Sequence, residues 1–185
     1  IITGSEGLLG TEISNFLEEQ GNIIIRCDLQ LGHDLTDESF VSKFFKDNKA
    51  DCLVNCYAIN PHVDSKDTST NMFNITLDSL NSYLQVNVLS LFSVCREFAS
   101  ANKSGTIINF SSTYGVVSPN PTLYEEGKEK HVGYCVSKSA VVQLTKYLAV
   151  HLAPNFRVNC VTPGGVNFTP TNEQSKKFIK MYEER

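Results

Sequence analysis

Three glycines spaced three residues apart constrain the fold of this chain more than any other feature of its sequence. Gly4, Gly7 and Gly10 follow Ile1-Ile2, which has the character of a strand end, and precede a helical segment. Glycines at this spacing permit a tight turn, a close approach of the backbone to a pyrophosphate, and close packing of a helix on a strand. The chain is therefore predicted to begin with a strand, a turn and a helix whose N-terminus can face phosphate groups.

Apolar strand-like runs alternate with helical segments along the rest of the chain. After a first helix ending at residue 21, strands are predicted at residues 22–27, 51–56, 105–110 and 156–162. Between and after them, helices capped by Thr36 and Asp78 and ending near residues 48 and 101 are predicted, followed by helices at residues 134–153 and 172–185. This alternation indicates a doubly wound parallel α/β sheet, a Rossmann fold of three layers, α/β/α, formed as one domain by residues 1–185.

Composition excludes several classes of partner. The net charge is −4 and the Lys and Arg residues are scattered, which gives no electrostatic basis for binding nucleic acid or an anionic membrane. The six cysteines lie in apolar runs without a C-x-x-C pair or metal-ligand spacing. They are predicted to be buried thiols of a cytoplasmic protein without a metal site.

An acidic residue ends the second predicted strand. Asp28 lies where a carboxylate can accept hydrogen bonds from ribose hydroxyls, and its charge would repel a 2′-phosphate. This placement favours NAD over NADP, although the nearby Arg26 favours the opposite choice and an ordinary turn residue is the alternative. Asp34-Leu35-Thr36 either begins a short adjacent strand or leads directly into the next helix.

Tyr134 and Lys138 lie four residues apart in an unusually apolar helical segment, so they would share one helix face. A phenol titrates near ~10 and needs roughly 3 pH units, about 4 kcal/mol, of phenolate stabilisation to transfer protons at neutral pH. A nearby ammonium supplies up to about 4 kcal/mol of this in a semi-buried site. The pair is therefore a candidate proton-transfer site, although such pairs also form ordinary solvated faces.

A second pair with the same spacing, Tyr124 and Lys128, competes with it. Gly127 lies inside this segment and a polar, charged run follows, so the segment is interpreted as loop.

Further polar residues are predicted near the ends of the central strands. Asn55 and Ala58 follow the third strand, Ser111-Ser112 follow the fourth, and Pro163-Gly164-Gly165-Val166 forms a rigid turn after the last. Asn87 lies inside an apolar helix, either as a satisfied packing residue or as a backbone or water contact near the site. Two long loops, residues 59–76 and 113–132, are expected to border a substrate.

These motifs, in this order, resemble the short-chain dehydrogenase/reductase family over essentially the whole chain. The resemblance implies that Tyr134 exchanges a proton with the substrate oxygen and that Lys138 lowers the tyrosine pKa. It further implies that Ser112 binds the reacting oxygen and that Asn87 holds a water linked to Lys138. The residues implied to contact the cofactor, NAD in preference to NADP, are Gly4, Ser5, Glu6, Gly7, Leu8, Gly10, Asp28, Asp34, Leu35, Asn55, Ala58, Tyr134, Lys138, Pro163, Gly164 and Val166.

Some features depart from the family pattern. The gap between Ser112 and Tyr134 is long, which indicates an insertion after Gly115, and the usual Asn-Asn-Ala-Gly run is Asn55-Cys56-Tyr57-Ala58. The chain begins at Ile1 and ends in a charged segment, so it is predicted to be a fragment without part of its first strand and without the C-terminal lid and last strand. The Ser-Ser-Thr-Tyr-Gly run and the Pro-Gly-Gly turn are similar to bacterial oxidoreductases of surface-sugar and flagellin-glycan biosynthesis.

The function implied is hydride transfer between a nicotinamide cofactor and a secondary alcohol or ketone, such as that of a sugar. Two alternatives stay open: a sugar-nucleotide epimerase or dehydratase that uses the cofactor transiently, and a dinucleotide-binding regulatory protein without turnover. A small-molecule substrate is expected. Because the helices of Asn87 and Tyr134 are apolar on more than one side, a homodimer or homotetramer is also expected.

Overall fold

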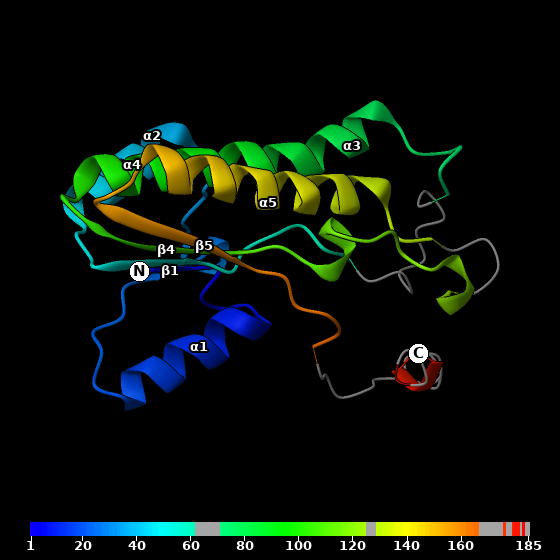
Figure 1. Cartoon of the computed structure of the whole chain (residues 1–185), viewed down its shortest axis with the longest axis horizontal. Coiled ribbons are helices and arrows are strands. Elements are labelled where there is room, and N and C mark those ends of the chain that lie inside the picture. Colours follow the sequence, from blue (N-terminus) through cyan, green and yellow to red (C-terminus); the bar gives the residue numbers. More distant parts are fainter. Residues whose placement is uncertain (62–70, 125–128, 167–175, 177–178, 182, 184–185) are drawn as a thin grey trace.

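A parallel sheet of five strands, in the order β2-β1-β3-β4-β5, forms the centre of the molecule (Figure 1). The computed structural model describes residues 1–61, 71–124, 129–166, 176, 179–181 and 183. The strands are β1 (Ile2–Thr3), β2 (Arg26–Cys27), β3 (Cys52–Asn55), β4 (Gly105–Phe110) and β5 (Phe156–Val161). The predicted parallel α/β architecture is confirmed.

Helices cover the sheet on both faces. Helix α1 (Leu8–Glu19) lies on one face, and α2 (Glu38–Asp47), α4 (Ser90–Ala101) and α5 (Val132–His151) lie together on the other (Figure 1). The main core fills the space between the sheet and this second group of helices, with Phe45, Phe98, Leu53, Ile107 and Val141 fully enclosed. None of the described helices is long and apolar enough to cross a membrane.

The second strand is shorter than the predicted residues 22–27. Arg26 and Cys27 are in register with Ile2 and Thr3 of β1, and the amide of Ile2 also donates to the Ile25 carbonyl at 3.0 Å. The chain then forms a short 3₁₀ turn, Leu29–Leu31, and no strand follows it before α2. Of the two alternatives for residues 34–36, the second is therefore correct: they form no strand and lead directly into α2.

The N-caps of two helices differ from the predicted ones. The Thr36 hydroxyl donates to Asp34 Oδ1 at 2.7 Å, so it is the carboxylate of Asp37 that accepts from the first amides of α2. Helix α3 (Leu77–Leu84) is capped by the hydroxyl of Thr76 instead of Asp78.

The predicted long helix at residues 78–101 is divided. Between α3 and α4, residues Gln85–Leu89 form a π-helical segment with Asn87 at its centre. Wide turns of this kind often occur at functional sites. The sequence predicts one continuous helix here, so the π-helical segment is a feature that the structure adds.

The predicted C-terminal helix falls mostly outside the described residues; residues 176, 179–181 and 183 are helical. All six cysteines are free thiols. Cys27 and Cys95 are buried as predicted, whereas Cys52, Cys56, Cys135 and Cys160 are half-buried.

A polar row crosses the sheet beneath the helices. Thr3, Asn55 and Asn109 are neighbours in register on β1, β3 and β4. The Thr3 hydroxyl donates to Asn55 Oδ1 at 2.8 Å, Asn55 Nδ2 donates to Asn109 Oδ1 at 2.9 Å, and Asn109 Nδ2 donates to the Thr145 hydroxyl on α5 at 3.0 Å. Because each buried amide has a partner, this row fixes the register of the strands and docks α5 without an unsatisfied polar group.

The turn after β1 requires glycine at two positions. Gly4 has a φ of +70°, and a Cβ there would lie 2.5 Å from the amide nitrogen of Tyr57. A Cβ on Gly10 would overlap the carbonyl group of Gly4. The first turn of α1 therefore lies directly on the strand-end turn, as the glycine spacing predicts.

We expect Gly10→Ala to lower the free energy of unfolding by about 3 kcal/mol or more, because the added methyl group meets rigid backbone. Gly7→Ala is the matched control, since a Cβ there lies 3.3 Å from the Gly4 oxygen, and it should cost about 1 kcal/mol or less. Urea denaturation of both variants measures the difference. Equal stabilities would contradict the close contact between α1 and the turn.

Candidate active site

Chain segments from four strands meet at the carboxyl edge of the sheet. The amide of Gly4 donates to the Cys27 carbonyl at 2.8 Å, and the amide of Ser111 donates to the Val161 carbonyl at 2.8 Å. The amide of Thr113 donates to the Pro163 carbonyl at 3.0 Å. The glycine turn, the end of β2, the Ser111-Ser112 pair and the Pro163 turn are therefore held at one edge, where parallel α/β sheets bind their ligands.

Tyr134 lies in the first turn of α5, close enough to Ser112 for that side chain to lower the pKa of the phenol. The Ser112 hydroxyl also accepts from the Tyr114 amide at 3.1 Å, which fixes its position after β4. Tyr134 and Ser112 are each 8 % exposed, so the two neighbouring residues are both buried. The structure thus brings together a phenol and an alcohol that can bind one substrate oxygen between them.

Lys138 follows one helical turn later on the same face. Its Nζ lies 5.8 Å from the centre of the Tyr134 ring and donates to the Phe110 carbonyl at 2.7 Å, at the end of β4. The lysine is 4 % exposed. The side chains of Tyr134 and Lys138 therefore converge at the sheet edge, as predicted from their spacing.

Burial shifts both groups toward their neutral forms. Desolvation raises the pKa of Tyr134, although the hydrogen bond from Ser112 opposes this shift. Desolvation lowers the pKa of Lys138 to about 8. The phenol therefore needs positive charge nearby to ionise near neutral pH, and the enclosed ammonium of Lys138 is one source.

Two backbone contacts hold Lys138 against the end of β4. The Ser111 hydroxyl donates to the Lys138 carbonyl at 2.6 Å, and the Ser139 hydroxyl donates to the Gly115 carbonyl at 2.8 Å. A Cβ on Gly115 would lie 2.7 Å from the Lys138 carbonyl carbon and oxygen. Ser111 is thus a structural partner of α5, while Ser112 reaches Tyr134.

Asn87 connects the π-helical segment to two other parts of the site. Its Oδ1 accepts from the Ile59 amide at 2.8 Å, and its Nδ2 donates to the Ile59 carbonyl at 3.2 Å and to the Ser137 hydroxyl at 2.9 Å. Ser137 in turn donates to the Tyr134 carbonyl at 2.9 Å. Asn87 therefore joins the segment after β3 to the first turns of α5, and no contact between its side chain and Lys138 is present among these bonds.

The glycine turn has the form of a phosphate cradle. Gly4, Gly7 and Gly10 leave the backbone bare where α1 begins, and side chains at Gly4 or Gly10 would fill space taken by backbone. Ser5 is fully buried and donates to Glu6 Oε1 at 2.9 Å, while Leu8, the first residue of α1, is exposed. These residues fit a dinucleotide whose pyrophosphate meets the N-terminus of α1.

Asp28 is anchored beside this cradle. Its two carboxylate oxygens accept from the backbone amides of Glu6, at 3.1 Å, and Gln30, at 2.8 Å. Arg26 pairs with Glu18 of α1 at 3.0 Å and with Glu6, in the turn before α1, at 3.7 Å. The carboxylate thus lies beside the glycine turn, where binding of a ribose stays a prediction, and the nearby guanidinium is paired with acids.

The remaining cofactor candidates lie in different surroundings. Asp34 is exposed and accepts from the Thr36 amide, and Leu35 packs in the core. The Asn55 side chain is used within the sheet, so only its backbone faces the edge, and Ala58 is half-buried beyond it. Pro163 and Val166 are half-buried and Gly164 is exposed.

Tyr124 belongs to the same neighbourhood without being on a helix. It follows a short 3₁₀ turn, Pro121–Leu123, and its hydroxyl lies 3.0 Å from that of Tyr114. The loop interpretation of this segment is therefore confirmed for Tyr124; Lys128 lies outside the described residues.

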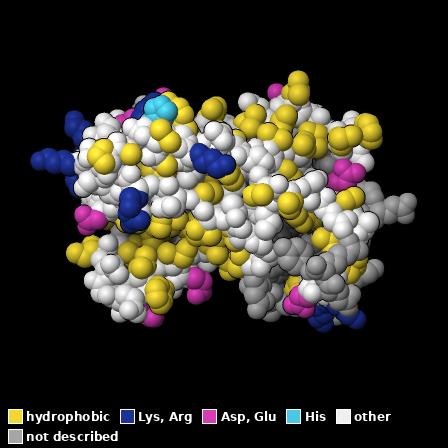
Figure 2. All heavy atoms as spheres, in the orientation of Figure 1, with side chains coloured by type: hydrophobic (Ala, Val, Ile, Leu, Met, Phe, Trp, Pro, Cys, Tyr) yellow, Lys and Arg dark blue, Asp and Glu magenta, His cyan; other side chains and the backbone are white. Residues whose placement is uncertain are grey.

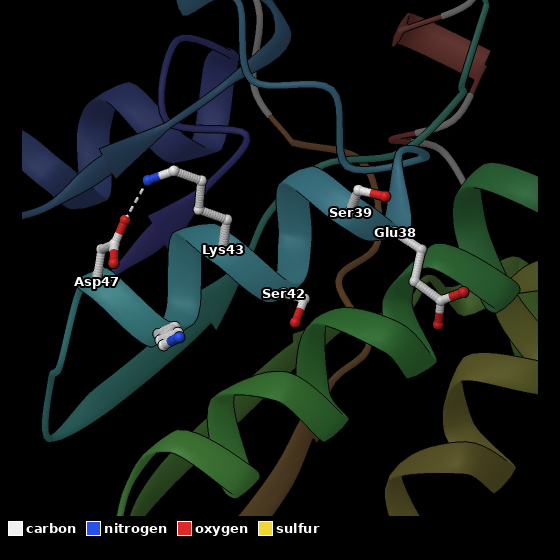
Figure 3. Close-up of a pocket in the computed structure, with 6 residues that line it drawn as sticks. Glu38, Ser39, Ser42, Lys43 and Asp47 are labelled. Atoms are coloured by element: carbon white, nitrogen blue, oxygen red, sulfur yellow. Dashed lines mark hydrogen bonds and ion pairs between the residues drawn. The ribbon is translucent and has the colours of Figure 1, made fainter.

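A hollow elsewhere on the surface does not belong to this site. It is lined by exposed side chains of α2 alone, among them Glu38, Ser42 and the ion-paired Lys43 and Asp47 (Figure 3). Its lining carries no group from the carboxyl edge of the sheet. Among the described residues, no cluster of three or more His, Cys, Asp or Glu side chains could hold a metal ion.

Three positions near Tyr134 were not selected from the sequence. Ser137 and Gly115 hold α5 through the contacts described above. The glycine at the end of the Ser-Ser-Thr-Tyr-Gly run is the sequence signal that could have indicated the close contact at Gly115. Lys130 stands over the Tyr134 ring, with its Nζ 4.5 Å from the ring centre. The sequence alone places Lys130 in a polar, charged run that is interpreted as loop.

Comparisons with known proteins agree with this geometry. A family model described as Enoyl-(Acyl carrier protein) reductase matches residues 5–185. The chain is 30% identical over 158 residues to L-fucose dehydrogenase of Oryctolagus cuniculus, a match that covers 83% of this chain and 49% of that protein. It is 26% identical over 196 residues to nodulation protein G of Rhizobium meliloti (strain 1021), covering 96% of this chain and 76% of that protein. The chain thus spans about half the length of the rabbit relative and about three quarters of the bacterial one.

A solved structure has the same fold. The short-chain dehydrogenase of Leptospira borgpetersenii, solved with bound NAD+, has a TM-score of 0.80 and 25% identity, covering 98% of this chain and 74% of that chain. The extent of the family match, the parallel sheet and the arrangement of Ser112, Tyr134 and Lys138 lead to one conclusion: this chain belongs to the short-chain dehydrogenase/reductase family.

Proposed function

We propose that this protein is an NAD(P)-dependent oxidoreductase that interconverts a secondary alcohol and a ketone. The observation that carries the proposal is the buried cluster of Tyr134, Ser112 and Lys138 at the sheet edge, with the Lys138 Nζ 5.8 Å from the centre of the Tyr134 ring. Relatives named as L-fucose dehydrogenase and NAD-dependent glycerol dehydrogenase support this reaction class. They also favour a polyhydroxylated substrate such as a sugar.

A nicotinamide ring bound at the sheet edge would supply or accept the hydride. In the oxidation, Ser112 donates a hydrogen bond to the substrate oxygen, and the Tyr134 phenolate takes the hydroxyl proton while the substrate carbon loses a hydride. In the reduction, the Tyr134 phenol returns that proton to the developing alkoxide. The two side chains therefore orient one oxygen atom and move one proton.

Lys138 supports this proton transfer through its charge. A phenolate at neutral pH requires roughly 3 pH units of stabilisation relative to a free phenol, and burial of Tyr134 adds to that requirement. The Phe110 carbonyl and the backbone contacts of α5 hold the ammonium close to the ring. Lys138 is also proposed to bind the nicotinamide ribose.

Asn87 is proposed to keep the first turns of α5 in place. Both polar atoms of its side chain are engaged by Ile59 and Ser137, so its direct effect is on the position of Tyr134. The water that the family resemblance implies between Asn87 and Lys138 stays a prediction.

We expect Tyr134→Phe to lower kcat by at least a hundredfold while leaving dinucleotide affinity within about twofold, because the phenol acts on the substrate proton. Tyr124→Phe is the matched control and should retain activity, since Tyr124 contacts Tyr114 and lies outside α5. NADH formation and cofactor titration measure both effects. Loss of activity in the control alone would transfer the proton-transfer role to Tyr124.

Screening for the reaction uses sugars and polyols with the protein at its full natural length. Turnover of a sugar nucleotide without net NADH formation would favour an epimerase or dehydratase instead.

NAD is proposed as the preferred cofactor. Asp28 presents a carboxylate at the end of β2, and Arg26 is neutralised by Glu18 and Glu6, so a 2′-phosphate would meet a negative group without a free cation from Arg26. The NAD+ in the Leptospira structure supports the choice.

We expect Asp28→Asn to reduce the preference for NAD over NADP by about tenfold, because the substitution removes the repulsive charge and retains a hydrogen-bond acceptor. Glu19→Gln, at the exposed end of α1, is the control for a change of net charge. Parallel titrations with NAD and NADP measure the cofactor preference of each variant. Tighter binding of NADP by the unmodified protein would refute the role given to Asp28.

A homodimer or homotetramer through α4 and α5 is also proposed. Exposed apolar side chains lie on these helices, among them Phe92, Val136, Tyr147 and Val150, and apolar groups are spread over the helical face in Figure 2. Val150 is 74% exposed, which is unfavourable for an isolated surface helix. A cytoplasmic location remains a prediction from the free cysteines.

We expect Val150→Glu to dissociate the oligomer, because a carboxylate in an apolar interface loses its hydration. Ile23→Glu, at an exposed apolar position distant from α5 in sequence, should leave the assembly intact. Light scattering at micromolar concentration measures the mass of each. A monomeric unmodified protein would rule out the proposed assembly.

A further inference from the structure

Tyr134 has a second lysine beside it that the family pattern does not include. Lys130 lies in the loop immediately before α5, four residues before Tyr134, and its Nζ is 4.5 Å from the centre of the Tyr134 ring. The Nζ of Lys138 is farther away, at 5.8 Å. Two lysine ammonium groups therefore lie near the Tyr134 ring, one from a residue before it in the sequence and one from a residue after it.

Neutral oxygen atoms hold the Lys130 ammonium in this position. Its Nζ donates to Asn60 Oδ1 and, at 3.2 Å, to the Pro61 carbonyl, both in the segment after β3. In the described part of the chain, Lys130 forms no ion pair with a carboxylate. Two neutral oxygens accept from the ammonium, its Nζ lies over the ring, and no carboxylate among the described residues pairs with it.

These contacts argue against a role in binding a ligand. An ammonium group has three donors, and here two of them already have oxygen acceptors in the protein. A substrate anion would have to displace Asn60, Pro61 or the Tyr134 ring. The ammonium group of Lys130 instead lies over the ring of Tyr134.

We propose that Lys130 is a positioning residue that acts through Tyr134: its ammonium, held over the ring by Asn60 and Pro61, stabilises the phenolate. The ring face attracts a cation in the neutral phenol, and ionisation adds a full negative charge within the same distance. The attraction is therefore stronger in the phenolate than in the phenol, which lowers the tyrosine pKa. The kinetic consequence rests on the proposed function, whereas the effect on ionisation does not.

The other groups near Tyr134 do not make the charge of Lys130 redundant. Lys138 contributes a cation from α5, and Ser112 and Tyr114 contribute hydroxyl groups from the segment after β4. Cys135, the neighbour of Tyr134 on α5, has a thiol whose pKa is raised by burial and is therefore neutral. His131 contributes a ring that accepts from the Gly133 amide through Nδ1 and stacks on Tyr83.

The titration of Lys130 sets the pH range of the effect. Burial lowers the pKa of Lys130 to about 8, so its charge is present at neutral pH. As the pH rises through that value, the ammonium loses its proton unless the phenolate has formed, since a phenolate favours the charged lysine. The assistance to Tyr134 therefore operates at and below about pH 8.

The test measures the ionisation of Tyr134 without turnover. The ultraviolet absorbance of tyrosinate is titrated in the protein with saturating NAD+, and the same titration of Tyr134→Phe is subtracted to isolate this tyrosine. We expect Lys130→Met to raise the pKa of Tyr134 by about 1 unit, a tenfold loss of phenolate at a given pH. Lys130→Arg should restore most of the shift, and Lys146→Met, which removes an exposed cation from α5, should have no effect.

Kinetics provide the second arm. For the reaction proposed above, the pH profile of kcat in Lys130→Met should move to higher pH by about 1 unit with KM little changed. An unchanged tyrosine pKa in a folded Lys130→Met protein would overturn the inference. A shifted pKa in a protein without dehydrogenase activity would support it and overturn the proposed function instead.

Discussion

The docking of α5 onto the end of β4 is the contact on which the candidate site depends. The Lys138 ammonium donates to the Phe110 carbonyl, and the Ser111 hydroxyl donates to the Lys138 carbonyl. Gly115 lies so close to the Lys138 backbone that no side chain fits between them. Because these contacts join the first turns of α5 to the sheet edge, Tyr134 is placed against Ser112 with little freedom.

The burial of Tyr134 and Lys138 determines which protonation states this contact favours. An enclosed ammonium beside an enclosed phenol is unfavourable to both charged forms in isolation, yet each stabilises the other when the phenol ionises. Neutral carbonyl oxygens hold the two lysines, and neither lysine has a carboxylate partner among the residues that the structure describes. The surroundings therefore favour a tyrosine that can release and accept a proton, and the polar row from Thr3 to Thr145 supplies the rigid base beneath it.

The glycine turn and the π-helical segment are both local departures from regular backbone structure near the candidate site. Gly4 and Gly10 let α1 begin directly on the strand end, which leaves backbone amides facing outward. The π-helical segment turns the amide of Asn87 toward Ile59 and Ser137, so that three chain segments are joined by one side chain. Both features replace regular packing with a local backbone form where a ligand is expected.

Sequence by itself determined the order of strands and helices, the glycine turn and the pairing of Tyr134 with Lys138, because periodicity and short spacings are local properties. Only the tertiary structure decided what depends on distant neighbours. The strand expected at residues 22–27 is limited to Arg26 and Cys27 in the structure, and Asn55 is hydrogen-bonded within the sheet because Thr3 and Asn109 lie beside it. The π-helical segment and the place of Lys130 over Tyr134 were equally hidden, since each depends on contacts with the segment after β3 that no sequence spacing encodes.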